Sequence, residues 1–248
     1  MTATAPPPAA ALAQEIRVRL AENAVPGRAE AERTYLKHEL THLGVPVPAV
    51  RAVVRGVLRA HPGLDRGSVL ELAEELWAPP VHESRTCAAL VLESRVGLLR
   101  PADTALLERM LRTATTWAHV DLIAPKVAGP LLLGHPQVAA TALRWSRQEE
   151  LWVRRGGVLA YLLPLRSPAA FEEHFGGFTA LADPLLSDPR FFVRKAIGWT
   201  LREGAEHHPA EVADWLAGRL ERVSGLTLRE ALRPVDEAVR ARLLAARG

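Results

Sequence analysis

The sequence has a single cysteine, Cys87, and therefore no internal disulfide and no multi-cysteine zinc site. Cys87 lies in the apolar stretch RTCAALVL, so we expect a buried thiol and not a nucleophile. The sequence has no run of about 18 apolar residues, the length needed to cross a bilayer. The N-terminal MTATAPPPAAA lacks the charged and long apolar parts of a secretory signal. We expect a cytoplasmic protein that is not attached to a membrane, with a disordered arm at residues 1–10.

Lysine is almost absent: three of the 31 basic residues are lysines, at positions 37, 126 and 195, and the rest are arginines. A composition rich in arginine and alanine is typical of a GC-rich genome and does not by itself indicate a function. The net charge of +3 and the pI near 9.5 are compatible with a polyanionic partner without demonstrating one.

Several motifs of common enzyme classes are missing, namely a glycine-rich phosphate loop, HExxH, GxSxG and a cysteine–histidine zinc spacing. The nine histidines are scattered along the chain. Three of them, His61, His135 and His208, directly precede a proline and are expected to mark helix boundaries. The sequence therefore predicts no metal site and no cofactor.

Apolar residues recur at spacings of three and four in nearly every segment, as in AVRAVVRGVLRA and EVADWLAGRL. Prolines fall where these segments begin, as in PVPAVR and HPAEVADWL, where a missing N–H costs a helix nothing. No strand pattern is evident. The sequence predicts an all-α protein made of short helices.

A weak internal repeat links these helices. LWVRRGGVLAYL (151–162) aligns with FFVRKAIGWTL (191–201) at an offset of 40 residues, and SRTCAALVL (84–92) is a third copy upstream. Helix pairs at a period of about 36 to 40 residues indicate a HEAT-like α-solenoid, in which each pair buries its apolar face only on its neighbours. We predict one repeat domain over residues 11–248, with a concave face.

Four polar or aromatic side chains are not needed by a plain repeat. Trp117 and Asp121 are four residues apart, so on a helix they share one face, one turn apart. Either Arg154 or Arg155 must face away from solvent if the VLAYLL face is buried, and Trp199 follows Lys195 by four residues. A lone tryptophan usually packs and a lone aspartate is usually solvated. Their corresponding positions in successive repeats favour a shared site.

These stretches resemble a known family. YLKHELTHLGVP (35–46), ELWAPPVHESRTCAAL (75–90), TWAHVDLIAP (116–125), LWVRRGGVL (151–159) and FFVRKAIGWTLRE (191–203) are similar, in this order, to the DNA alkylation repair glycosylases of the AlkC/AlkD group, and most similar to AlkD. The resemblance implies a HEAT-like solenoid whose concave, positively charged face binds duplex DNA. It also implies a monofunctional glycosylase that releases N3- and N7-alkylated purines without flipping the base into a pocket.

The resemblance assigns roles to matching residues. Asp121 matches the catalytic carboxylate, Trp117 and Trp199 match the two aromatics that flank the sugar of the lesion, and Arg155 matches the arginine that completes the cleft and positions a phosphate. Substrate or DNA contacts are implied for four more residues: Tyr35, Arg194, Lys195 and Arg202. The expected partner is double-stranded DNA that contains alkylated purines, bound by a monomer associated with the nucleoid.

Three departures from the family pattern bear on substrate range. Thr116 stands where relatives tend to have a tryptophan, Ala118 replaces a polar or acidic residue, and Gly156-Gly157 stands where small alanines are usual. If the helix behind Arg155 is regular there, each glycine loosens it by about 1 kcal/mol. General repair and self-protection against one alkylating compound both remain open. So do two alternatives to an enzyme, a HEAT scaffold that binds damaged DNA and an adaptor that binds a protein.

Overall fold

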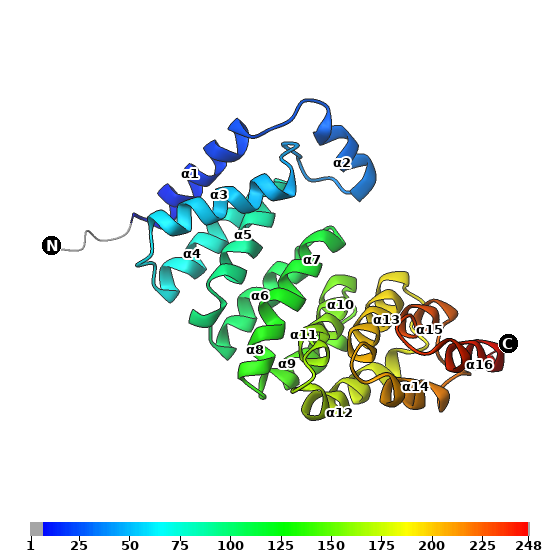
Figure 1. Cartoon of the computed structure of the whole chain (residues 1–248). Coiled ribbons are helices and arrows are strands. Elements are labelled where there is room, and N and C mark those ends of the chain that lie inside the picture. The colour runs from blue at the N-terminus through cyan, green and yellow to red at the C-terminus, as the bar shows by residue number, and fades with distance from the viewer. Residues whose placement is uncertain (1–6, 248) are drawn as a thin grey trace. The chain divides into compact units, whose positions relative to one another are not determined.

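The computed structural model describes residues 7–247 and is all-helical over that range (Figure 1). Within these residues the single β feature is an isolated parallel bridge between Thr41 and Val81. The predicted all-α class is confirmed. No helix in the described part of the chain is both long and apolar enough to span a membrane.

The described residues form two compact units, and the chain passes between them more than once. The first unit contains the residues up to Arg100 together with Thr113–Ile123, and the second contains Pro101–Arg112 together with the chain from Ala124 onward. Helix α1 begins at Ala9, two residues before the predicted start of the domain, and residues 1–6 of the predicted arm lie outside the described range. The prediction of a single domain stays a prediction.

Most helices of the first unit pack around α5. Helix α5 contacts α3, α4 and α7, while α1 contacts α3 and α4. Its elements are α1 (Ala9–Glu22), α2 (Arg28–Leu36), α3 (Val47–Ala60), α4 (Arg66–Trp77), α5 (His82–Ser94), the 3-10 turn η1 (Val96–Leu98) and α7 (Trp117–Ile123). Cys87 is completely buried in α5, as its apolar context predicted, and burial raises the pKa of its thiol.

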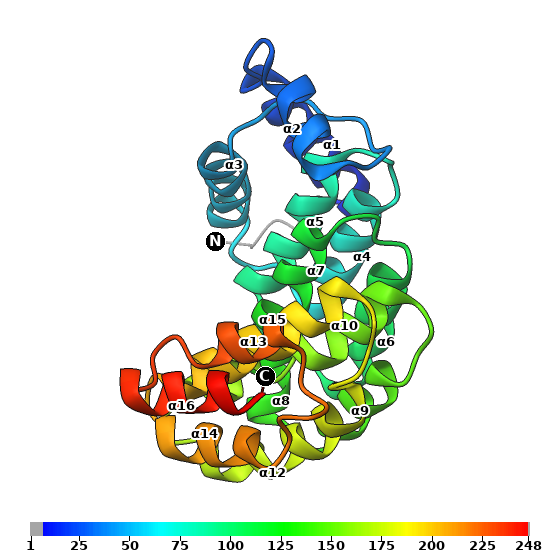
Figure 2. The ribbon, with the colours of Figure 1, turned by 90° about the vertical axis from the view of Figure 1, so that its right-hand side faces the viewer.

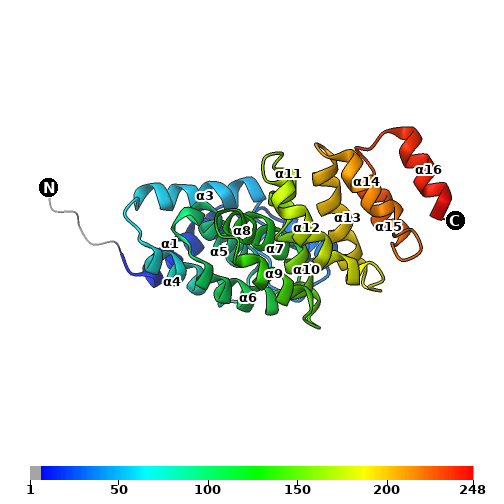
Figure 3. The same ribbon diagram turned by 90° about the horizontal axis from the view of Figure 1, so that it is seen from below.

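The second unit is also built from helices that pack on one another. Figures 2 and 3 show α13 beside α15, and α10 packs on both α9 and α13. Its elements are η2 (Pro101–Asp103), α6 (Thr104–Arg112), the π-helical segment η3 (Ala124–Ala128), α8 (Gly129–Gly134), α9 (Val138–Ser146), α10 (Leu151–Leu159), α11 (Leu162–Arg166), α12 (Phe171–Ala182), η4 (Asp183–Leu185), α13 (Phe191–Ala205), α14 (Pro209–Ala217), α15 (Gly225–Ala231) and α16 (Glu237–Arg247).

The predicted repeat coincides with real helix starts. Helices α10 and α13 begin at Leu151 and Phe191, which reproduces the 40-residue offset between the two sequence stretches. Two of the three His-Pro histidines follow the last residue of a helix, after α3 and α8, and His208 directly precedes Pro209 at the start of α14. The helical repeat architecture is therefore confirmed, and the His-Pro pairs do mark helix boundaries.

Helix α10 is regular at Gly156-Gly157, and both glycines are buried by close packing. A Cβ on Gly157 would lie 2.5 Å from the carbonyl oxygen of Ala142 and 2.6 Å from the backbone nitrogen of Ser146 in α9. A Cβ on Gly156 would lie 2.7 Å from Leu111. The glycines thus let the α10 backbone approach α9 more closely than alanine would permit.

We predict that Gly157→Ala destabilises the protein by about 1–3 kcal/mol, because the overpacking cost against the α9 backbone exceeds the gain in helix propensity. The matched control is Gly176→Ala in α12, where an added Cβ meets no atom within 4 Å. That control should be neutral or stabilising by up to about 1 kcal/mol. Urea unfolding measures both free energies, and a Gly157→Ala protein at least as stable as the wild type would contradict the prediction.

Candidate functional site

Helix α7 presents two of the predicted residues on one face. Trp117 is its first residue and Asp121 follows one turn later, and both are half-buried. The hydroxyl oxygen of Thr116 is buried before the helix and accepts a hydrogen bond from the N–H of Ala118 at 3.3 Å, as an N-cap residue does. Thr116, one of the departures from the family pattern, thus caps the helix that carries the predicted carboxylate.

The α-helical hydrogen bonding of α7 changes just after Asp121. Pro125 lies four residues further on and has no N–H to donate to the carbonyl of Asp121, and the chain continues as the π-helical segment η3. Single π-helical turns often occur at functional sites. The spacing D-x-x-x-P is visible in the sequence and marks this position.

An apolar cavity of about 360 Å³ lies beside Trp117 within the first unit. Its lining includes Tyr35, Leu36, Leu90, Ala118 and Leu122. The Tyr35 ring, which is 71% exposed, meets the Trp117 ring edge-on with centroids 6.0 Å apart. The structure therefore brings Tyr35 and Trp117 together, with Asp121 one turn along α7 from Trp117, and the small side chain of Ala118 contributes to the cavity wall.

In the second unit, Arg155 is buried, with only 3% of its surface exposed. Its Nη1 donates to the carbonyl oxygen of Phe192 at 2.5 Å, and its guanidinium lies 5.7 Å from the centre of the Phe192 ring. Of the two arginines that could face away from solvent, Arg154 and Arg155, it is Arg155 that is buried. Arg155 joins the middle of α10 to the start of α13.

Helix α13 carries the other predicted residues of this unit. The indole nitrogen of Trp199 donates to Glu203 at 3.0 Å, and Lys195 donates to Glu230 on α15 at 2.7 Å. Arg202 also pairs with Glu230, whose side chain is 3% exposed. Burial raises the pKa of Glu230, but the hydrogen bond from Lys195 and the charge of Arg202 lower it on balance.

Arg194 completes the set of predicted residues on α13. Its side chain is half-buried, and its carbonyl oxygen accepts a hydrogen bond from Thr227 of α15 at 3.1 Å. The predicted residues thus form two groups, one in each unit. Tyr35, Trp117 and Asp121 form the first, and the remaining five form the second.

Asp188 ties α10 to the turn before α13. It accepts hydrogen bonds from Arg154 at 2.9 Å and from Arg190 at 2.5 Å, and its side chain is 3% exposed. Burial raises the pKa of Asp188, but the hydrogen bonds from Arg190 and Arg154 outweigh it and bring that pKa to about 2. This network holds the helix that carries Arg155 next to the one that carries Trp199.

A group of histidines near Trp117 was not predicted from the sequence. His38, His42, His82 and His119 form one stack in the first unit, with neighbouring ring centroids 4.7 to 5.4 Å apart. They looked scattered because the loop 37–46 and the start of α5 are far apart in sequence. The spacing H-x-x-x-H in KHELTH was the one available signal.

Residues 16–235 match the sequence profile of the DNA alkylation repair enzyme family. The chain belongs to this family. Membership supports an enzyme that acts on DNA in the repair of alkylation damage. A search of curated proteins gave no match.

Solved structures of similar fold agree with this assignment. One, described as a predicted DNA alkylation repair enzyme from Enterococcus faecalis, is 19% identical, has a TM-score of 0.75, and pairs 87% of this chain with 98% of its own. AlkD2 from Streptococcus mutans is 15% identical with a TM-score of 0.61, over 91% of this chain and 99% of its own. At these identities the likeness establishes a shared fold.

We predict that Asp188→Asn lowers stability at pH 7 by about 2 kcal/mol, because Arg154 and Arg190 lose a charged acceptor. The folded pKa lies below the ordinary value, so this stabilisation is complete above about pH 4 and disappears as the pH falls through about 2. Chemical denaturation of wild type and variant across this range measures the difference. The control is Asp214→Asn at an exposed position of α14. A destabilisation that persists unchanged at pH 2 would contradict the assigned ion pairs.

Proposed function

We propose that the chain is a DNA glycosylase that excises N3- and N7-alkylated purines from duplex DNA, acting as a monomer and without drawing the base into a pocket. The observation that carries the proposal is the pairing of Trp117 and Asp121 on one face of α7, beside an apolar cavity that Tyr35 also lines. Membership in the DNA alkylation repair enzyme family supports it.

A lone carboxylate suits this reaction. Glycoside hydrolysis usually needs two carboxyl groups, because one must protonate a poor leaving group. A purine alkylated at N3 or N7 is already cationic and departs neutral, so no acid is required and no cofactor need supply one. Asp121 then stabilises the developing sugar cation and orients the attacking water.

The aromatic side chains have a matching task. Indole faces attract cations by about 0.5–2 kcal/mol, depending on desolvation. Trp117 is half-buried against Tyr35 and the cavity, so it offers both a face for the sugar and a wall that excludes water. Electrostatic stabilisation by a carboxylate is stronger where water is excluded.

Trp199 is assigned as the other aromatic for the sugar, and Arg155 as a positioning residue. The burial of Arg155 and its hydrogen bond to Phe192 favour positioning over direct participation. A cation beside the sugar would also oppose the charge that develops there. Arg194, Lys195 and Arg202 then provide phosphate contacts, for which Lys195 and Arg202 must share or leave Glu230.

We predict that Asp121→Asn lowers the excision rate by about 10²–10³-fold, because the transition state loses its compensating charge. The measurement is mass spectrometry of the bases released from methylated duplex DNA, with 7-methylguanine as the main product. The Asp214→Asn protein serves as the matched control, since it removes a carboxylate from an exposed position.

Circular dichroism establishes that each variant is folded. Unchanged excision by folded Asp121→Asn would contradict the assigned role, and a wild type that binds DNA but releases no base would favour a non-catalytic scaffold. Comparing the release of methylated and bulky N3 adducts separates general repair from self-protection.

We predict that Lys195→Met weakens DNA binding and reduces the slope of log K against log salt by about 0.9, the value for one phosphate contact. Fluorescence anisotropy on duplex DNA over a salt series measures the slope. Lys126→Met removes the same charge from an exposed site on η3 and controls for net charge. An equal slope in wild type and Lys195→Met would assign Lys195 to the Glu230 ion pair alone.

A further inference from the structure

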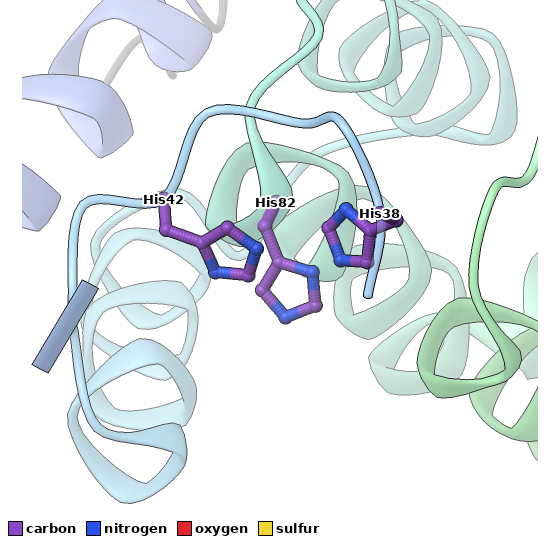
Figure 4. A group of neighbouring side chains, drawn as sticks. All are labelled: His38, His42 and His82. Atoms are coloured by element: carbon purple, nitrogen blue, oxygen red, sulfur yellow. The ribbon is translucent and has the colours of Figure 1, made fainter. Parts of the chain in front are cut away.

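The loop 37–46 is fixed to the start of α5 by backbone hydrogen bonds. The buried carboxylate of Glu83 accepts from the N–H groups of Leu43, Gly44 and Val45 at 2.7 to 3.2 Å. The N–H of His82 donates to the carbonyl of Thr41 at 2.9 Å. These bonds place two loop histidines, His38 and His42, around His82, and we call these three residues the histidine cluster (Figure 4).

Four of the six ring nitrogens in the cluster are buried and have no hydrogen-bond partner among the described residues. The His42 side chain is 1% exposed, and neither of its nitrogens has a hydrogen-bond partner among the described residues. The same holds for Nε2 of His38 and Nδ1 of His82. Buried polar atoms are almost always satisfied, and those that are not call for a bound water or ion.

We propose that His38, His42 and His82 bind one divalent transition-metal ion, of which zinc is the representative. Each ring offers one nitrogen, and the three nitrogens lie within 4.8 Å of one another. Imidazole nitrogen is a preferred ligand of zinc, copper and nickel. Nitrogens on one tetrahedral zinc lie about 3.3 Å apart, so binding draws the ligand nitrogens together by up to about 1.5 Å. The three rings lie nearly parallel, with interplanar angles of 16° to 27°, so they also rotate for their lone pairs to point at one ion.

A carboxylate beside His42 supports the assignment. Oε2 of Glu32 lies 3.7 Å from Nδ1 of His42 and has no hydrogen-bond partner in the described chain. Metal-bound histidines usually donate their second N–H to such a carboxylate, which leaves the other nitrogen for the ion. With Glu32 in this role, Nε2 of His42 becomes the ligand.

A histidine that binds a metal through one ring nitrogen carries its proton on the other. Nδ1 of His38 accepts a hydrogen bond from the N–H of Leu40 at 3.2 Å. Ligation through Nε2 places the ring proton on Nδ1, which can then no longer accept the hydrogen bond from Leu40.

The ion would act as a structural clamp between the loop and α5. His38 follows Tyr35 by three residues, and His82 accepts a hydrogen bond at its carbonyl from the His119 ring of α7 at 3.1 Å. An occupied cluster would therefore stiffen both elements that carry the aromatic pair Tyr35 and Trp117. The ion takes no direct part in the proposed bond cleavage, and its binding does not depend on that reaction.

The test uses the tag-free full chain, stripped with a chelator and titrated with Zn²⁺ by calorimetry. We expect one ion per chain, a rise in Tm, and slower hydrogen exchange in residues 37–46. Co²⁺ in place of Zn²⁺ should give the visible absorption of a nitrogen-coordinated, low-symmetry site. His42→Gln and His38→Gln should each lose the binding, and Glu32→Gln should weaken it by roughly tenfold.

The matched control is His208→Gln, because Glu172, His208 and Glu211 form a second, exposed group of possible ligands. Zinc binding that is lost in His208→Gln and kept in His38→Gln overturns the proposal, as does a folded wild type that binds no zinc. Should His42→Gln fail to fold, the Co²⁺ spectrum of the wild type and its loss in His38→Gln decide the question. Excision activity is measured separately, so either proposal can fail alone.

Discussion

Three buried carboxylates hold the helices and the loop that carry or adjoin the predicted site residues. Each carboxylate accepts several hydrogen bonds or ion pairs. Glu83 holds the loop after α2, Asp188 joins α10 to the turn before α13, and Glu230 joins α13 to α15. A buried charge is tolerated only when it is paired or hydrogen-bonded. Each of these carboxylates therefore fixes a geometry as well as a contact, since a shift of the neighbouring helix would leave a charge unpaired.

The sequence was sufficient to predict what depends on local periodicity. The helix starts at Leu151 and Phe191 follow from an apolar repeat, and the shared face of Trp117 and Asp121 follows from helix geometry. The histidine cluster could not be predicted, because it depends on Glu83 folding a loop back over α5. The burial of Arg155 depends on the carbonyl of Phe192, which lies 37 residues further along the chain.

The departures from the family pattern at Thr116 and Gly156-Gly157 also depend on neighbours that the sequence does not show. From the sequence alone, Gly156-Gly157 is expected to weaken a helix, and Thr116 is a replacement of a tryptophan. In the structure, the missing side chain of Gly157 lets α10 pack closely on the α9 backbone, and Thr116 caps α7. Both departures change how the site is supported while Asp121 and Trp117 keep their places on α7. The functional meaning of a substitution at such positions depends on its neighbours in space.

The length of α7 explains why its surroundings matter for the proposed chemistry. Seven residues are too few for a helix to be stable alone, and Pro125 prevents α-helical hydrogen bonding from extending past Asp121. The orientation of Asp121 therefore depends on the Thr116 cap, on packing against α5, and on the bond from His119 to the His82 carbonyl. The last of these contacts joins α7 to the histidine cluster. A more rigid histidine cluster would therefore also restrict the motion of α7, and with it the orientation of Asp121.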